Sequence, residues 1–169
     1  MRPTLRRPVA LLVLLALPWI GADDEPEPLR LTEPIVCLKI VGYDRYEARP
    51  EPALTSDEKL LIYIEPLNHT IVRDEESGRF RAHLTQSARV RRQGQKRVLW
   101  EQEDLGDYKP ESDHPPRTLY LSSTIALKGL PLGDYEIDIT YQDRLREGAE
   151  ATRTVEFRII PAPPGADPE

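Results

Sequence analysis

Residues 130–143 alternate strictly between apolar and polar side chains after a turn that contains Pro131 and Gly133. Successive side chains of a β-strand point to opposite faces, so this alternation predicts a strand with one buried and one solvated face. The residues expected to face inward are Tyr135, Ile137, Ile139 and Tyr141, and those expected to face outward are Glu136, Asp138, Thr140 and Gln142. This segment constrains the fold more than any other in the chain.

Short segments with strand-like composition recur along most of the chain. We expect strands at residues 35–43, 60–65, 68–73, 79–91, 97–101, 118–127 and 152–160. The first of these is apolar on both faces, which predicts that it is covered on both sides. No apolar repeat keeps helical spacing over a window of about 11 residues. The sequence therefore predicts an all-β, Ig-like antiparallel β-sandwich of about seven or eight strands.

Two segments between these strands have the composition of connections. Gln93-Gly94-Gln95 predicts a hairpin turn, because glycine adopts a positive φ without steric cost. Residues 102–117 are acidic and contain prolines, so we expect a loop there.

The two ends of the chain differ in composition from the middle. Three arginines (Arg2, Arg6 and Arg7), an apolar run and the small residues before residue 23 predict a signal peptide over 1–22. The apolar run is shorter than the about 20 residues that a membrane span needs, although an uncleaved anchor stays an alternative. We expect an acidic Pro-rich leader over 23–34, the sandwich over 35–160 and a Pro-rich tail over 161–169. The predicted location is secreted or periplasmic.

The charge balance limits the classes of partner. Loss of residues 1–22 would remove three of the 23 basic residues and none of the 29 acidic ones, so the formal charge would fall from −6 to −9. Such an excess of acid disfavours general binding to nucleic acid or to an anionic membrane surface. A soluble monomer without a membrane span after signal removal is the expected state.

Cys37 is the only cysteine, so it has no intrachain disulfide partner. It lies among apolar residues, and free cysteine is commonly buried, so we expect a small buried hydrophobe. An intermolecular disulfide or a reactive thiol is the alternative. A structural role is also expected for Trp100, which lies in the strand predicted at 97–101.

The turn before the alternating strand resembles a known fold feature. Leu130, Gly133 and Tyr135 form a Leu-x-x-Gly-x-Tyr pattern that resembles the tyrosine corner of immunoglobulin-like sandwiches. Together with the turn at Gly148 and the closing strand up to Ile159, it is similar to the last two strands of secreted bacterial Ig-like or fibronectin-type-III-like modules that lack a disulfide. The resemblance implies structural roles for Gly133 and Tyr135, and it implies a binding or spacing role for the protein.

A basic stretch stands out against the acidic background. If residues 79–97 form one hairpin, their cations could make a docking patch for an anionic polymer or an acidic partner. The preferred interpretation is protection of an exposed strand edge by charge. The residues of this possible patch are Arg79, Arg81, Arg89, Arg91, Arg92, Lys96 and Arg97.

No motif predicts catalysis, a metal site or a cofactor. The histidines at 69, 83 and 114 lack the close spacing of zinc ligands, and the acidic residues of 101–114 lack the Asp-x-Asp-x-Asp-Gly calcium pattern. We found no nucleophile elbow, P-loop or dinucleotide fingerprint. Asn68-His69-Thr70 matches the acceptor pattern for N-glycosylation.

The sequence thus predicts a non-enzymatic module that binds an unknown protein or an envelope polysaccharide, or acts as a spacer. The alternative is a carbohydrate-binding module, and a small secreted hydrolase is the least favoured class. Sugar binding usually needs exposed aromatic rings, for which the candidates are Tyr43, Tyr46, Tyr108 and Tyr120.

Overall fold

The computed structural model describes residues 26–116 and 118–162, which contain fourteen strands and no helix. The predicted signal peptide and residues 163–169 of the predicted tail lie outside this range. The strands are β1 (Arg30–Leu31), β2 (Ile35–Gly42), β3 (Arg45–Ala48), β4 (Ala53–Thr55), β5 (Lys59–Ile64), β6 (Pro66–Leu67), β7 (Val72–Arg73), β8 (Phe80–Arg81), β9 (Leu84–Arg92), β10 (Val98–Tyr108), β11 (Glu111–Ser112), β12 (Leu121–Ala126), β13 (Gly133–Asp143) and β14 (Glu150–Ile160).

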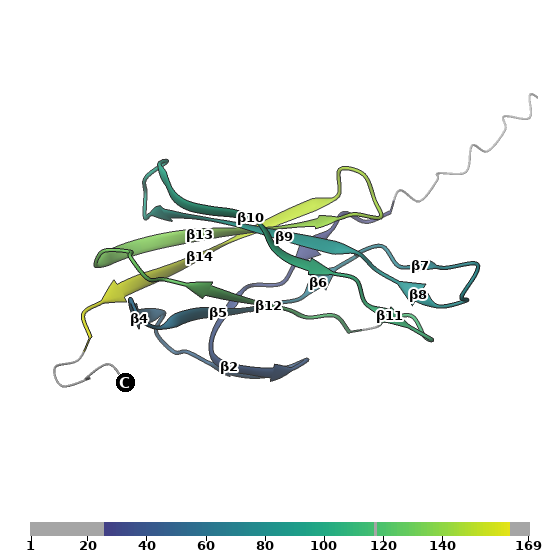
Figure 1. Ribbon diagram of the computed structural model, residues 1–169, viewed down its shortest axis with the longest axis horizontal. Helices are drawn as coiled ribbons and strands as arrows, with labels where there is room; N and C mark the ends of the chain where they lie inside the picture. The colour runs from purple at the N-terminus through teal and green to yellow at the C-terminus, as the bar shows by residue number, and fades with distance from the viewer. Residues whose placement is uncertain (1–25, 117, 163–169) are drawn as a thin grey trace, which may run out of the picture.

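Two sheets form the layers of a sandwich (Figure 1). The larger sheet has the order β10-β9-β13-β14-β4, and the smaller one has the order β12-β5-β2-β3. All pairings are antiparallel except that of β14 with β4. Two small sheets, β1-β6 and β11-β8-β7, complete the fold. The prediction of an all-β sandwich is confirmed.

The core lies between the two large sheets, and its residues follow the period of two. Strand β13 alternates as predicted: the side chains of Tyr135, Ile137, Ile139 and Tyr141 are fully buried. The smaller sheet contributes the even-numbered residues of β5 and the odd-numbered residues of β12. These are the apolar Leu60, Ile62, Ile64, Leu121 and Ile125 and the polar Ser123.

The turn before β13 has the hydrogen bond that the resemblance implied. The Tyr135 hydroxyl donates to the Pro131 carbonyl at 2.6 Å. Gly133 has a φ of +141°, and a Cβ there would overlap a guanidinium nitrogen of Arg92. That guanidinium lies 5.2 Å from the centre of the Tyr135 ring. Gly133 and Tyr135 therefore stabilise the fold at this end of the sandwich.

The folded unit begins earlier than predicted. Leu29 and Leu31 are buried in the core, and β1 pairs with β6. Arg153 holds this segment by donating from Nε and Nη2 to the Leu31 carbonyl at 3.1 and 2.7 Å. The leader predicted over 23–34 therefore needs correction at its end. Two leucines among prolines and acids have no detectable period, so only their tertiary contacts reveal their role.

Four predicted elements differ from the structure. The strand expected at 79–91 is divided into β8 and β9, which belong to different sheets, so residues 79–97 do not form one hairpin. The loop expected at 102–117 is strand up to Tyr108, because β10 continues past two register shifts against β9. The strand expected at 68–73 is reduced to β7, since Asn68 has a φ of +60° and interrupts it. Strand β2 is not covered on both sides, because the side chains of Leu38 and Val41 are 44% and 53% exposed.

Candidate functional site

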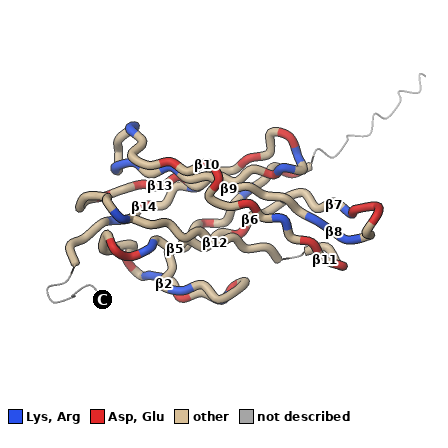
Figure 2. The backbone as a smooth tube through the Cα atoms, viewed as in Figure 1, with Lys and Arg blue, Asp and Glu red and all other residues tan. Residues whose placement is uncertain are grey.

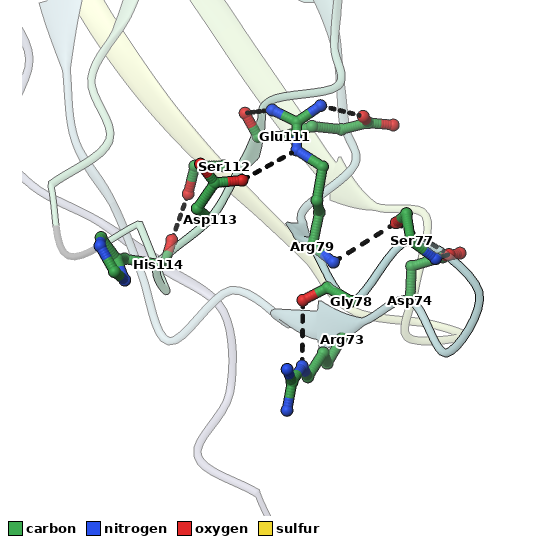
Figure 3. A network of polar contacts seen from close by, with 9 residues as sticks. All are labelled: Arg73, Asp74, Ser77, Gly78, Arg79, Glu111, Ser112, Asp113 and His114. Atoms are coloured by element: carbon green, nitrogen blue, oxygen red, sulfur yellow. Dashed lines mark hydrogen bonds and ion pairs between the residues drawn. The ribbon is translucent and has the colours of Figure 1, made fainter.

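Four of the seven cations of the predicted basic patch form ion pairs with carboxylates. Arg79 contacts Glu111 at 3.2 Å and Asp113 at 3.4 Å (Figure 3), and Arg81 contacts Asp74 at 3.6 Å. The backbone amide and hydroxyl of Ser77 donate to the Asp74 carboxylate, and these bonds lower the pKa of Asp74. At this end of the predicted patch, each arginine therefore has at least one carboxylate partner.

Two of the three arginines of β9 are also paired with carboxylates of neighbouring strands. Arg89 Nε contacts Glu101 of β10 at 2.5 Å. Arg91 contacts Glu136 at 2.7 Å and also pairs with Asp138, both on β13. Because β9 lies between β10 and β13, it has no free edge, so the edge-protection hypothesis is wrong for these residues. Their role is to pair carboxylates of neighbouring strands.

The other three predicted patch residues lie at the turn between β9 and β10. Arg92 donates to the Leu132 carbonyl at 3.4 Å and covers the Tyr135 ring. Lys96 and Arg97 are exposed and have no ion-pair partner within the part of the chain that the structure describes. Of the seven residues of the predicted patch, only those of this turn have no ion-pair partner among the described residues, and Figure 2 shows the blue segments at the end of the β9–β10 hairpin.

A polar hollow of about 520 Å³ lies on the outer face of the larger sheet. Asp107 stands at one side of it, 2.8 Å from His83 Nε2 and 2.7 Å from Lys109 Nζ. The lysine first, and then the histidine, lower the pKa of Asp107. Four carboxylates line the hollow. Among the residues described, however, no three His, Cys, Asp or Glu side chains are arranged so that they could hold a metal ion. The hollow is lined by His83, Thr85, Gln86, Ser87, Arg89, Glu101, Glu103, Asp104, Asp107, Thr140, Gln142 and Arg144.

A tyrosine cluster lies on the outer face of the smaller sheet. At its centre is Tyr63 of β5, whose side chain is only 2% exposed. The ring of Tyr46 lies 4.7 Å away at 39°, and the ring of Tyr120 stacks at 5.5 Å and 14°. The three rings come from segments far apart in the sequence. Because two of them cover Tyr63, the outer face of the smaller sheet buries an aromatic side chain where a solvated face was expected.

The Glu65 carboxylate connects this cluster to the β2–β3 turn. It accepts hydrogen bonds from the hydroxyls of Tyr63 at 2.7 Å and Tyr43 at 3.3 Å. The backbone amide of Asp44, which has a φ of +51°, donates to the Tyr63 hydroxyl at 3.0 Å. Burial, together with the charge of Glu65, raises the pKa of Tyr63 to about 12. These bonds hold the turn against the sheet.

The structure thus groups three of the four tyrosines predicted for sugar binding. Tyr43, Tyr46 and Tyr120 surround Tyr63, which sequence reasoning missed because it lies within a strand that reads as generally apolar. Tyr108 is not part of the cluster. Its hydroxyl lies 3.2 Å from Gln86 Oε1 and 3.1 Å from the Ser122 carbonyl oxygen, two acceptors that come from different sheets.

The β2–β3 hairpin carries exposed apolar side chains beside the cluster. Leu38, Val41 and Tyr43 are 44%, 53% and 40% exposed. Strand β3 pairs only with β2, so its other side is an edge of the smaller sheet. The β2–β3 hairpin therefore combines exposed apolar and aromatic side chains with a free strand edge, and such a surface is suited to contact with a partner.

Three further predicted residues have local roles. Cys37 is buried, its thiol lies 3.3 Å from the Ile35 carbonyl, and burial raises its pKa, which confirms the expected small hydrophobe. Trp100 is half-buried and packs against the core. The Asn68 amide donates to Glu27 Oε2 at 2.8 Å and to the Pro28 carbonyl at 3.3 Å, so the predicted glycan acceptor is engaged in holding the N-terminal segment.

Within the described residues, no helix is long and apolar enough to cross a membrane. The chain was also compared with known proteins. Neither a protein-family model nor a curated protein sequence matches it.

Proposed function

We propose that the protein is a non-enzymatic binding module of the secreted or periplasmic compartment and that it binds another protein through the β2–β3 hairpin. The observation that carries this proposal is the exposure of Leu38, Val41 and Tyr43 on one projecting hairpin. The composition of residues 1–22 supports the compartment. The hydrogen bond from Tyr135 to Pro131 supports an Ig-like or fibronectin-type-III-like arrangement.

The hairpin combines what protein interfaces need. Tyrosine is enriched in interface hot spots, because its ring buries much area at a low entropic cost. The free edge of β3 offers backbone groups for strand addition by an extended segment of a partner. The bonds from Tyr43 and Tyr63 to Glu65 keep the hairpin ordered before binding, which lowers the entropy lost on association.

A photo-crosslinking amino acid at position 41 tests this proposal in the envelope fraction. We expect a discrete crosslinked species that is lost when Leu38→Ser is added, and whose partner binds the purified protein. Position 67 is a matched control, because Leu67 is also exposed (39%) but lies on β6, outside the hairpin. Equal crosslinking from both positions, or none from position 41, would contradict the assignment of the hairpin.

Carbohydrate binding is the second candidate, because Tyr43, Tyr46 and Tyr120 gather around Tyr63 beside the Glu65 carboxylate. A sugar could stack on an exposed ring while its hydroxyls donate to the carboxylate. Affinity electrophoresis through gels that contain envelope polysaccharide separates the two candidates. Retention that Tyr43→Ala abolishes and Leu38→Ser leaves unchanged would favour sugar over protein.

A further inference from the structure

The β9–β10 turn and the β12–β13 turn form one surface, which we call the basic tip. It consists of Lys96, Arg97, Val98, Leu99, Lys128 and Leu132. The three aliphatic side chains are among the most exposed large apolar ones described, with Val98 at 43%, Leu99 at 42% and Leu132 at 56%. The three cations are exposed as well.

Contacts show that the two turns lie side by side. The guanidinium of Arg92 donates to the Leu132 carbonyl at 3.4 and 3.5 Å, and the amide of Gln93 donates to the Asp134 carbonyl at 3.1 Å. Lys128 and Trp100 line the same small hollow of about 40 Å³. The tip therefore belongs to one end of the sandwich, at the upper left of Figure 1.

The charge of the tip is opposite to that of the whole chain. The formal charge of the chain is −6, yet the tip carries three cations and no carboxylate. The neighbouring carboxylates already have arginine partners: Glu101 contacts Arg89 at 2.5 Å, and Asp134 contacts Arg158 at 2.5 Å. Glu136 contacts Arg91 at 2.7 Å and also accepts a hydrogen bond from the Gly94 amide of the β9–β10 turn at 3.2 Å. The cations of the tip complement an anionic surface, and its exposed aliphatic side chains complement an apolar layer beneath that surface.

We propose that the basic tip docks the protein on the surface of an anionic lipid bilayer. Lys96, Arg97 and Lys128 would lie at the level of the phosphate groups, while Val98, Leu99 and Leu132 would enter the boundary with the acyl chains. Trp100, just beneath, would lie at the interface where tryptophan is favoured. The negative net charge of the chain disfavours general adsorption to an anionic bilayer. The basic tip alone would therefore set the orientation of the protein on the membrane.

Docking of this kind is independent of the proposed partner site. The β2–β3 hairpin belongs to the smaller sheet, below the tip in Figure 1, and none of its residues belongs to the tip. A partner could therefore bind the hairpin while the tip contacts lipid.

Vesicle flotation tests the proposal with a chain that starts at residue 23. All described strands and core residues lie within residues 29–160, so this chain keeps the whole sandwich. Trp100 is its only tryptophan, and a blue shift of its emission reports contact of the tip with lipid. We expect binding to vesicles of phosphatidylglycerol and phosphatidylcholine in equal parts, but not to phosphatidylcholine alone, and weaker binding at high salt.

The variants separate the contributions of charge and apolar contact. Lys96→Gln with Arg97→Gln should lower partitioning roughly 25-fold, at about fivefold for each cation near an anionic surface. Val98→Thr with Leu99→Thr should lower it at least about fivefold by removing apolar contact. Lys39→Gln with Arg45→Gln is the matched control, because it removes two exposed cations from another hairpin with exposed aliphatic residues. That control should bind as the parent does.

Three results would overturn the proposal. The first is no binding to the anionic vesicles even at low salt. The second is an equal loss in the Lys39/Arg45 control, which would show adsorption without a site. The third is unchanged vesicle binding in the Val98/Leu99 variant together with equally tight binding to a soluble polyanion, which would assign the tip to polyanions. Circular dichroism and thermal unfolding establish that every variant is folded.

Discussion

On the outer face of the larger sheet, charged and hydroxyl side chains pair across neighbouring strands, whereas on the outer face of the smaller sheet a tyrosine is buried. Arg91 bonds two carboxylates of β13, and Thr140 and Thr152 hydroxyls lie 2.8 Å apart across β13 and β14. Tyr63 and Cys37, on the other sheet, are each only 2% exposed.

The two sheets of the sandwich treat their outer faces differently. The five-stranded sheet buries one apolar face against the core, and polar pairs cover its solvated outer face. The four-stranded sheet buries side chains on both faces, and its second core is small and formed by rings from three segments. That second core holds the β2–β3 hairpin, so stability and the proposed binding surface are coupled on this side but not on the other.

The largest effect should come from Tyr63→Ala. Removal of a ring that is 2% exposed and contacts Tyr46 and Tyr120 should cost about 3–5 kcal/mol of unfolding free energy, as for aromatic residues in cores. Chemical denaturation measures it. A cost typical of surface positions would mean that the outer face of the smaller sheet is no second core.

Alkaline pH should lower the unfolding free energy through Tyr63, on the outer face of the smaller sheet. The pKa of Tyr63 is about 12 in the folded protein and about 10 in the unfolded chain. The stabilisation is therefore complete below about pH 10 and is lost as the pH rises towards 12. Tyr63→Phe should reduce this slope. Tyr141→Phe is the comparison between the two sheets, and it should reduce the slope as well, because burial also raises the pKa of Tyr141. An unchanged slope in Tyr63→Phe would contradict the raised pKa of Tyr63.

Arg91→Gln should cost about 1–2 kcal/mol, because it leaves the carboxylates of Glu136 and Asp138 close together and only partly exposed. Arg91→Lys keeps the positive charge and should therefore lose less unfolding free energy than Arg91→Gln. Urea denaturation of both variants measures the effect, and an equal loss in the two would point to packing instead of charge.

Tyr135→Phe should cost about 1 kcal/mol, because it removes only the hydrogen bond to Pro131. The ring still packs against Phe157, with centroids 5.5 Å apart. Tyr135→Ala, which also opens a cavity, should cost about 3–5 kcal/mol. A neutral Tyr135→Phe would show that the hydroxyl bond at the turn does not contribute to stability.

The smallest effect is expected for Arg89→Gln. Its pair with Glu101 is exposed to solvent, and exposed pairs contribute little because water and salt screen them. The unfolding free energy should match that of the parent within error. A clear loss here, as large as that of Arg91→Gln, would remove the distinction between exposed and partly buried pairs on this face.

Local pattern was sufficient for β13 and β14 of the larger sheet, but it missed β4, the extension of β10 to Tyr108 and the break between β8 and β9. The alternation in β13 predicted its buried residues, and the turn pattern of Gly133 and Tyr135 implied the bond to Pro131. The candidate surfaces were predicted less well. Tyr43, Tyr46 and Tyr120 were identified as aromatic candidates, but Tyr63 and Glu65, which hold them together, were not.

The sequence alone determined the all-β class, the inward face of β13 and the burial of Cys37, because each depends on the period or composition of one segment. Only the tertiary structure decided that Arg91 bonds Glu136 and Asp138, that Leu31 belongs to the core and that three distant tyrosines meet. These contacts depend on strand order and register, which arise from how whole strands pack and are not encoded in any single segment.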